Sequence, residues 1–398
     1  MKDKWIKPRH KVARKIIYPL LGLYIKAKTK IKIEKYKTEE KGPYFILYNH
    51  QTGYDQFIVA LSFKNPVYHV ASDDIFSMGF ASKVINYLSK PIPIKKNVSD
   101  ITAVRTCIKV AKEGGTIAIA PEGNRTYSGE TCSFNPAIVG LVKMLKLPVL
   151  IYKIEGGYNV FPRWADKPRK GKSRAYVSRE ISKEEIASLS KEELQSLIAK
   201  ELYNNDYDLT ESYKGSKKGE YLERVAYVCP KCGLSTFESK NNLIKCKNCG
   251  LTTLYQDDKT LKTSNVFPFN TYLDWYKYQE HFVNSLDLVS QKEQWFYQES
   301  IKLYKVIPCK KKILIDRKSF IRLYGNRYKI YINGNGQEFY FEDLLGVSVL
   351  GKNKLNVYYK DEVYQIKGDK RFNAVKYLNF YHRYINQVKE NGSNFLGL

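Results

Sequence analysis

The stretch Asn49–Asp55 reads Asn-His-Gln-Thr-Gly-Tyr-Asp and follows a short apolar run at residues 44–48 that predicts a β-strand. A histidine at the end of a strand, with a carboxylate five residues later, is a candidate pair of catalytic base and orienting group. Five positions along a regular helix turn through about 500°, which would hold the two side chains about 140° apart. His50 and Asp55 can therefore meet only if the residues between them form a turn, and Gly53 allows an unusual turn at little steric cost.

The same stretch has a plainer interpretation, in which it is a polar loop and Asp55 caps the helix that follows. The apolar spacing of Phe57, Ile58 and Leu61 predicts a helix that begins near Asp55. A histidine and an aspartate at this spacing are common by chance, so this stretch alone leaves both interpretations open.

A second polar stretch, Pro121–Thr126, reads Pro-Glu-Gly-Asn-Arg-Thr and directly follows a predicted strand at residues 116–120. Two polar turns that each follow an apolar strand are expected at the same edge of a sheet. In open α/β sheets, ligands bind at the carboxyl ends of the strands. We therefore expect the two stretches to contribute to one site.

Together the two stretches resemble the motifs of the glycerolipid acyltransferases, specifically the 1-acylglycerol-3-phosphate (lysophosphatidic acid) acyltransferase family. The spacing of His50 and Asp55 resembles the first family motif, and Pro121–Thr126 resembles the family's Phe-Pro-Glu-Gly-Thr-Arg-Ser motif. The chain departs from that second motif at three positions, with Ala120 for Phe, Asn124 for Thr and Thr126 for Ser. The resemblance covers roughly residues 10–205, about half of the chain.

The resemblance implies transfer of an acyl group from a thioester, either acyl-CoA or an acyl-carrier protein, to the free hydroxyl of a lysophosphatidate. His50 would accept the proton of that hydroxyl, and Asp55 would hold the other ring nitrogen and stabilise the imidazolium. No acyl-enzyme is required, because a thiolate is already a good leaving group. Arg125 would clamp the substrate phosphate through its planar guanidinium.

The candidate substrate-binding residues are Lys95, Lys96, Glu122, Gly123, Asn124, Arg125 and Thr126. Glu122 and Gly123 would shape the second turn, with Glu122 either paired to Arg125 or in contact with the glycerol. Lys95 and Lys96 follow a short predicted strand, where they would either add phosphate contacts or form a solvated charged turn. The backbone donors for the tetrahedral oxyanion are not identified by the sequence.

The net charge of +27 implies an anionic partner, which could be acidic lipid, nucleic acid or an acidic carrier protein. Residues 1–41 hold 14 Lys and Arg against 4 Asp and Glu. Within them, the apolar residues 16–25 are too few to span a bilayer, which takes about 20, but they lie between basic clusters as an interfacial anchor does. The alternative is an ordinary core helix at the edge of a domain. The resemblance also implies an amino-terminal helical pair that rests on the membrane.

No signal peptide is visible, because no apolar core with a cleavage site follows the basic start. We therefore expect a peripheral or monotopic protein at the cytoplasmic face of the cell membrane, with lysophosphatidate and an anionic membrane surface as its partners. The amino-terminal segment is assigned to residues 1–41.

Alternating strands and helices predict an α/β acyltransferase domain at residues 42–205, with a mixed sheet flanked by helices. The expected strands cover residues 44–48, 66–70, 91–94, 116–120, 148–154 and 175–178. The expected helices lie between them, and two capping boxes open further helical turns at Ser182 and Ser190.

Two Cys-x-x-Cys pairs, each followed by glycine, predict a zinc ribbon within residues 206–264, after a polar linker. Its thiolate ligands would be Cys229, Cys232, Cys246 and Cys249. Four ligands leave no open coordination position, so the zinc would be structural and would hold a segment too small for its own core. This cysteine usage indicates a reducing compartment. Cys107, Cys132 and Cys309 have no nearby partner and are interpreted as buried or incidental thiols.

The carboxy-terminal part is expected to contain a helical segment at residues 265–305 and a β domain at residues 306–398. The helical segment is aromatic-rich, with Leu273, Tyr276, Phe282 and Leu286 expected to be buried. Seven short strands and one helix at residues 371–388 resemble the layout of a pleckstrin-homology barrel. The resemblance rests on layout and not on a motif, and it does not indicate a role.

Two other functions fit parts of the sequence. A basic protein with a zinc ribbon could bind nucleic acid, and a catalytically idle member of the family could tether a complex to lipid. The excess of positive charge surrounds the apolar amino-terminal segment, which favours a membrane over nucleic acid as the anionic partner.

Overall fold

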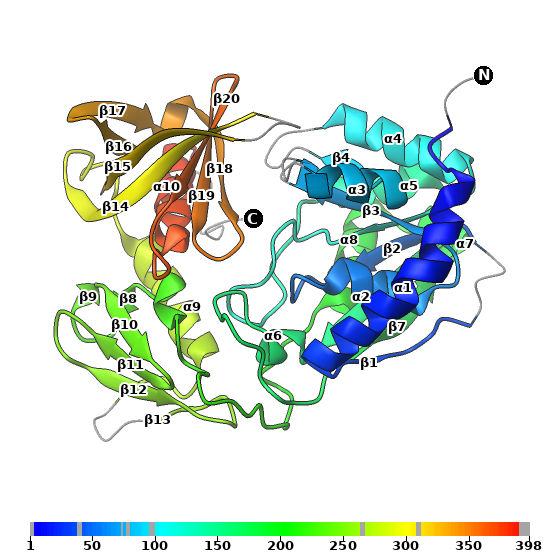
Figure 1. Ribbon diagram of the computed structural model, residues 1–398, viewed down its shortest axis with the longest axis horizontal. Coiled ribbons are helices and arrows are strands. Elements are labelled where there is room, and N and C mark those ends of the chain that lie inside the picture. The colour runs from blue at the N-terminus through cyan, green and yellow to red at the C-terminus, as the bar shows by residue number, and fades with distance from the viewer. Residues whose placement is uncertain are drawn as a thin grey trace.

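Figure 1 shows the computed structural model, in which an α/β domain, a small cysteine-bearing β unit and a carboxy-terminal β domain follow one another. The structure describes residues 4–37, 42–72, 75–76, 80–94, 100–262, 267–307 and 312–389.

The α/β domain is built on a seven-stranded sheet with the order β1-β7-β6-β2-β5-β3-β4. Its strands are β1 (Lys32–Ile33), β2 (Phe45–Tyr48), β3 (Val67–Ser72), β4 (Ile92–Ile94), β5 (Thr116–Ile119), β6 (Val149–Glu155) and β7 (Arg174–Ile181). The five neighbouring strands from β6 to β4 are parallel, and β7 is antiparallel to β6. The predicted mixed α/β sheet is therefore confirmed. The strand at 174–181 does not close the sheet, because β1 pairs with its outer edge.

Helices cover both faces of this sheet. They are α1 (Pro8–Thr29), α2 (Asp55–Ser62), α3 (Phe80–Leu88), α4 (Ile101–Lys112), α5 (Ala137–Leu145), α6 (Gly157–Val160), α7 (Lys183–Ser188) and α8 (Lys191–Leu202). Successive strand residues point to opposite faces. Phe45 and Leu47 of β2 accordingly pack with α4, α5 and α8, whereas Ile46 packs with α1 and α2. Ser190 forms the predicted capping box at the start of α8.

The cysteine-bearing unit holds a short hairpin and a four-stranded antiparallel sheet. The strands are β8 (Val228–Cys229), β9 (Gly233–Leu234), β10 (Phe237–Lys240), β11 (Leu243–Cys246), β12 (Thr252–Tyr255) and β13 (Leu261–Lys262). The preceding residues, which we expected to be a polar linker, pack against the α/β domain instead. Asp206 is fully buried and accepts hydrogen bonds from the backbone N–H groups of Gly156 and Asn159, and Tyr213 is also buried.

The predicted helical segment at 265–305 is only partly helical. Helix α9 (Tyr272–Ser285) is present, but residues from Trp295 onward form the long strand β14 (Trp295–Val306). The helical prediction was wrong there because aromatic content was weighed above periodicity. Tyr297, Ile301 and Leu303 are buried and lie at even spacings, which is the period of a strand.

The carboxy-terminal β domain contains one seven-stranded antiparallel sheet and a final helix. Besides β14, it comprises β15 (Ile313–Tyr324), β16 (Arg327–Ile332), β17 (Asn335–Tyr340), η4 (Phe341–Asp343), β18 (Leu344–Leu350), β19 (Lys354–Tyr359), β20 (Glu362–Lys367) and α10 (Ala374–Val388). Two of the seven short strands predicted from the sequence, at residues 312–316 and 320–324, are one continuous strand, β15. Asn333 and Gly334 form a two-residue hairpin turn and both have positive φ, as a type I′ turn requires.

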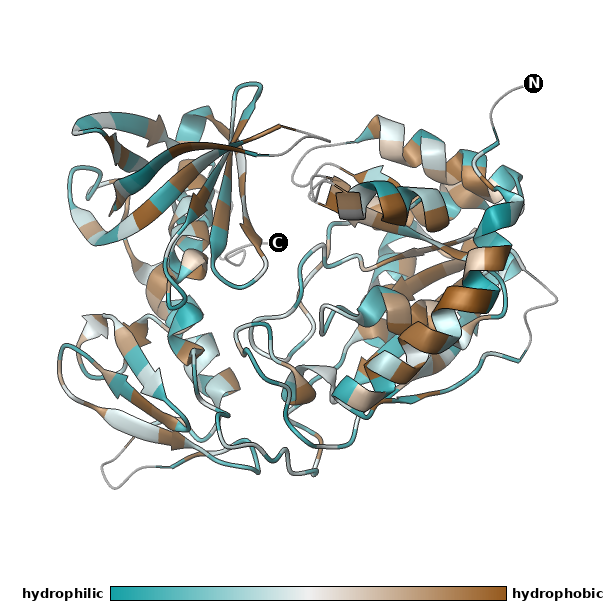
Figure 2. Cartoon of the chain, in the orientation of Figure 1, coloured by the Kyte–Doolittle hydropathy of each residue, from teal (hydrophilic) through white to brown (hydrophobic). Residues whose placement is uncertain are grey.

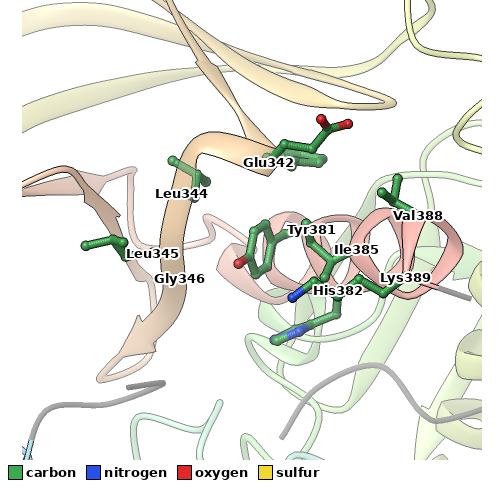
Figure 3. A pocket seen from close by; sticks show the side chains of 10 residues that line it. Glu342, Leu344, Leu345, Gly346, Tyr381, His382, Ile385, Val388 and Lys389 are labelled. Carbon is green, nitrogen blue, oxygen red and sulfur yellow. The ribbon is translucent and has the colours of Figure 1, made fainter. Parts of the chain in front are cut away.

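A pocket of about 450 Å³ lies inside the β domain, between α10 and the start of β18. Its lining includes Leu344, Leu345, Tyr381, His382 and Ile385 (Figure 3). No residue of the two motif stretches contributes to it.

One of the clusters of buried hydrophobic residues includes side chains from all three parts of the chain. Trp164 of the α/β domain, Val228 of the cysteine-bearing unit, Trp275 of α9 and Tyr377 of α10 belong to a single cluster of buried residues. Trp275 Nε1 also donates to the carbonyl of Val228 at 2.7 Å. The β domain is therefore packed against the α/β domain through a continuous interior.

Candidate active site

The sheet topology brings the two motif stretches together. Strands β2 and β5 are parallel neighbours, with Phe45 opposite Ile117, so the turns that follow them lie at the same edge. The backbone N–H of Thr126 donates to the carbonyl of His50 at 2.9 Å, which joins the turns directly. The two stretches therefore lie side by side at one edge of the sheet, as expected.

The turn at residues 50–55 wraps around the carboxylate of Asp55, which is fully buried. His50 Nδ1 lies 2.8 Å from Asp55 Oδ2. The same carboxylate accepts hydrogen bonds from Gln51 N at 2.6 Å, from Thr52 N at 2.8 Å and from Thr52 Oγ1 at 2.6 Å. Helix α2 does begin at Asp55, but the carboxylate is turned back into the turn and does not cap the helix.

This geometry selects the tautomer of the neutral imidazole. With Nδ1–H donating to Asp55, the lone pair of the neutral ring is on Nε2. The His50 side chain is 20% exposed, whereas Asp55 is inaccessible. The exposed side of the His50 ring can therefore accept a proton, and the buried carboxylate of Asp55 can stabilise the resulting imidazolium.

Gly53 lies beside Arg125, a proximity that the sequence did not indicate. Its φ is not positive, so the turn does not place this glycine in the left-handed region. A Cβ at this position would instead lie 3.4 Å from Arg125 Nη1. The guanidinium of Arg125 therefore lies within van der Waals reach of the turn that carries His50.

Arg125 is a partly buried cation beside the imidazole turn. Burial and the neighbouring charge of Arg163 lower the pKa of Arg125 to about 10, so the side chain remains charged at neutral pH. Within the described ranges, its guanidinium has no carboxylate partner and makes no side-chain hydrogen bond. A partly desolvated guanidinium that is not paired with a carboxylate is suited to bind an anion.

Glu122 does not pair with Arg125, which corrects one of the two roles that we considered for it, and it is too deeply buried to face the solvent. Only 3% of the residue is exposed. Its carboxylate accepts from His50 N at 2.7 Å and from Cys132 N at 2.8 Å. Burial raises the pKa of Glu122 to about 8, with a further contribution from Asp55, although the two backbone N–H groups act in the opposite direction. The Glu122 side chain therefore links the backbone of His50 to the backbone of Cys132 in the interior.

The other candidate residues of the second turn differ in their placement. Gly123 is exposed with φ +67°, a conformation that favours glycine. Asn124 is half-buried. Thr126 is fully buried, and its hydroxyl donates to the carbonyl of Glu130 at 2.6 Å, so it closes the turn and does not face a substrate. Lys95 and Lys96 lie outside the described residues.

Sequence reasoning missed the side chains that anchor the first turn to β6 and α6. Asn49 Nδ2 donates to the carbonyl of Ile154 at 2.8 Å, and its Oδ1 accepts from Ile154 N at 2.7 Å. Gln51 Oε1 accepts from Tyr158 N at 2.9 Å. The available signal was an amide side chain directly at the end of an apolar strand.

The four predicted metal ligands form a cluster in which all sulfur atoms lie within 4.8 Å of one another. The Sγ atoms of Cys229 and Cys249 are 3.6 Å apart, as are those of Cys232 and Cys246. Ligands at about 2.3 Å from a tetrahedral zinc ion are separated by about 3.8 Å, so the cluster could bind such a metal. Cys107 and Cys132 lie outside this cluster, and Cys309 lies outside the described residues.

Residues 29–154, which are 126 of the 398 residues, match the family model described as Acyltransferase. A comparison with curated proteins gave no match. Among solved structures, the chain is similar to the 1-acyl-sn-glycerophosphate (LPA) acyltransferase PlsC from Thermotoga maritima. That match has 21% identity and a TM-score of 0.40, and covers 50% of this chain and 80% of the other. A second similarity, to the Vps36 N-terminal PH domain, has 20% identity and a TM-score of 0.20, and covers 24% and 82%.

The buried carboxyl of Glu122 predicts a pH dependence of stability. Because its pKa is raised from 4.5 to about 8, the folded protein holds a proton there that the unfolded chain releases above pH 4.5. Its contribution is therefore fully present below pH 4.5 and falls as the pH approaches 8, by at most about 1.4 kcal/mol per pH unit. Relative to the wild type, Glu122→Gln should gain unfolding free energy as the pH is raised from 5.5 to 7.5.

Denaturant titrations at pH 5.5, 6.5 and 7.5 would measure this difference between the two proteins, with the exposed Glu184→Gln as a control. A difference between wild type and Glu122→Gln that stays constant over this range would show that Glu122 is ionised in the folded state throughout.

Proposed function

We propose that this protein is a membrane-associated acyltransferase that transfers an acyl chain from a thioester donor to the free hydroxyl of 1-acylglycerol-3-phosphate. The product would be phosphatidate for phospholipid synthesis, and the donor acyl-CoA or an acyl-carrier protein. The observation that carries the proposal is the meeting of the His50–Asp55 pair with Arg125 at one sheet edge, inside the acyltransferase-family domain.

In this reaction, His50 Nε2 accepts the proton of the acceptor hydroxyl while the hydroxyl oxygen attacks the thioester carbonyl. The tetrahedral intermediate then expels the thiolate as the carbon–sulfur bond breaks, and the imidazolium returns the proton to the sulfur. Asp55 stabilises the imidazolium between these steps. Its carboxylate is already oriented by three groups of Gln51 and Thr52, so little reorganisation is needed when the charge appears.

Arg125 binds the phosphate of the acceptor in this proposal. A guanidinium presents parallel N–H donors that match two phosphate oxygens, and partial burial strengthens such a pair. Because Arg125 Nη1 lies against Gly53, the phosphate would be held a short distance from His50. The acceptor hydroxyl is therefore oriented by its headgroup.

A membrane-facing surface is proposed on α1 and α3. On α1, the apolar side chains of Val12, Ile16, Leu20 and Leu23 recur at helical spacing and are each more than half exposed. On α3, Phe80 is 81% exposed. Figure 2 shows the apolar residues along α1. The last turn of this helix carries Lys26 and Lys28. None of the helices in the described ranges is apolar over a length that would cross a bilayer.

The proposed metal is a structural zinc ion held by Cys229, Cys232, Cys246 and Cys249. When bound, it would supply folding free energy to the cysteine-bearing unit. The metal takes no part in the chemistry of this scheme, and its function would be to hold together the segment that connects the α/β and β domains.

Replacing the base tests the proposed reaction. Purified protein should convert lysophosphatidate and acyl-CoA or acyl-carrier protein into phosphatidate, and His50→Ala should reduce kcat at least ~10³-fold. The exposed His281→Ala should retain wild-type activity. A panel of other lysophospholipid acceptors distinguishes lysophosphatidate acylation from a wider acyltransferase.

Undiminished product formation in His50→Ala would contradict the assignment of the base. A wild-type protein that binds acidic lipid but acylates none of the acceptors would favour a catalytically idle tether, and binding of nucleic acid in preference to lipid would favour the nucleic-acid function.

The apolar face of α1 predicts membrane binding. The double variant Leu20→Glu/Leu23→Glu should partition at least about tenfold less to vesicles of anionic phosphatidylglycerol. Each leucine that enters the bilayer contributes more than about 1 kcal/mol to binding. The matched control is Leu243→Glu/Leu254→Glu on the cysteine-bearing unit, which should still co-sediment with vesicles. Equal binding by both double variants would refute this membrane face.

The cysteine cluster predicts about one zinc ion per chain by elemental analysis. Cys232→Ser should lose the metal, while Cys107→Ala should keep it because this thiol is not in the cluster. Chelation should expose residues 228–262 to protease. A metal-free protein that resists protease in this segment would contradict the proposal.

A further inference from the structure

The turn between β18 and β19 lies beside the candidate active site, although it belongs to the β domain. Arg163, which follows α6 in the α/β domain, is 4% exposed and holds this turn in place. Its Nη2 donates to the carbonyl of Val349 at 2.6 Å and its Nε to the carbonyl of Gly351 at 3.1 Å. Its Nη1 donates to the carbonyl of Arg125 at 3.3 Å. One guanidinium therefore fixes the β18–β19 turn against the backbone of the second motif.

Lys352 is the next residue of this turn and reaches the α/β domain with its ammonium group. Its Nζ lies 2.9 Å from Asp166 Oδ1 and 5.2 Å from the centre of the Phe161 ring. Phe161 in turn stacks on Tyr54, with ring centroids 6.2 Å apart and an interplanar angle of 22°. Tyr54 belongs to the turn that carries His50, so a short chain of contacts joins Lys352 to that turn.

Positive charge exceeds negative charge around Lys352. Asp166 is already paired with Arg224, whose Nη1 lies 2.7 Å from Oδ1, so one carboxylate serves two cations. Burial and the charges of Arg224 and Arg125 lower the pKa of Lys352, whereas Asp166 raises it. Lys352 lies over Phe161, which stacks on Tyr54, and Arg125 Nη1 lies beside the neighbouring Gly53, so the two cations approach the same turn from different domains.

The ammonium of Lys352 has capacity for a further ligand. An ammonium group has three N–H donors, of which Asp166 occupies one. The side chain is 30% exposed, so it is accessible to a bound molecule. An anion between Arg125 and Lys352 would offset the mutual repulsion of the cations in this region.

We propose that Lys352 of the β domain is the second ligand of the acceptor phosphate, so that the headgroup is held between Arg125 and Lys352 where the two domains meet. Arg163 is a positioning residue, because it fixes the β18–β19 turn to the backbone of Arg125. This inference rests on the proposed function, since it assigns the same acceptor. It makes the phosphate monoester, with up to two negative charges, the headgroup that the site prefers over an uncharged one.

The test is equilibrium binding to the full-length protein, without the acyl donor. The probes are a short-chain lysophosphatidate below its micelle concentration and the monoacylglycerol of the same chain length, which lacks the phosphate. Lys352→Gln should raise the Kd for lysophosphatidate about tenfold and leave the Kd for monoacylglycerol unchanged. Lys352→Arg should restore most of the affinity, and the exposed Lys360→Gln should bind as the wild type does.

Asp166→Asn separates a ligand role from a structural one. If Lys352 only fastens the turn through Asp166, this variant should weaken lysophosphatidate binding as Lys352→Gln does, and that result would overturn the inference. The proposal expects binding equal to or tighter than that of the wild type, because a competing carboxylate has been removed. Thermal unfolding of each variant identifies any loss that arises from misfolding.

The outcomes for the inference and for the proposed function are distinct. Unchanged lysophosphatidate affinity in Lys352→Gln overturns the inference even if acyl transfer proceeds. Lysophosphatidate that binds with the expected dependence on Lys352, but is never acylated, contradicts the proposed function and supports the inference. A wild-type protein that does not bind lysophosphatidate overturns both.

Discussion

The buried carboxylate of Asp55 is the constraint on which the site depends. The hydrogen bonds that it accepts come from His50, Gln51 and Thr52, so opening this turn would leave a buried charge without partners. The closed turn sets the orientation of the imidazole. It also places the backbone of His50 where the second motif can bind it, through the N–H of Thr126 and the carboxylate of Glu122. One desolvated side chain thus determines the positions of both motifs.

The site combines residues that are close in the sequence with residues that are far apart in it. The proton-transfer pair is contained within six consecutive residues and needs only a turn and a strand end to form. The cations of the site come instead from separate segments, with Arg125 after β5, Arg163 after α6 and Lys352 from the β domain. Their meeting depends on the shared core that packs the β domain against the α/β domain. In the proposed reaction, headgroup binding would therefore be more sensitive to domain packing than proton transfer.

The parts of the site that could be predicted from the sequence are those with a local signature. The strand–turn repetition was enough to place both motifs at one sheet edge, and the two motifs together were enough to select His50 and Asp55 as a candidate pair. The burial of Glu122 and the space that Gly53 gives to Arg125 have no local signature, because both depend on a second loop. Strand β14 was missed because its aromatic residues obscured its alternation. Arg163 donates to backbone carbonyls 186 and 188 residues away. Such contacts cannot be predicted from the sequence, because a backbone carbonyl is present at every residue.

The arrangement of cations also bears on why the β domain is packed where it is. Arg125 and Arg163 lie close enough that the charge of one lowers the pKa of the other, and Lys352 adds a third charge to the same region. Such a cluster costs folding free energy when no anion is present. A bound phosphate removes part of that cost, and a ligand that binds only the folded state stabilises it. The headgroup would thus hold the two domains together at the moment when the hydroxyl must be kept beside His50.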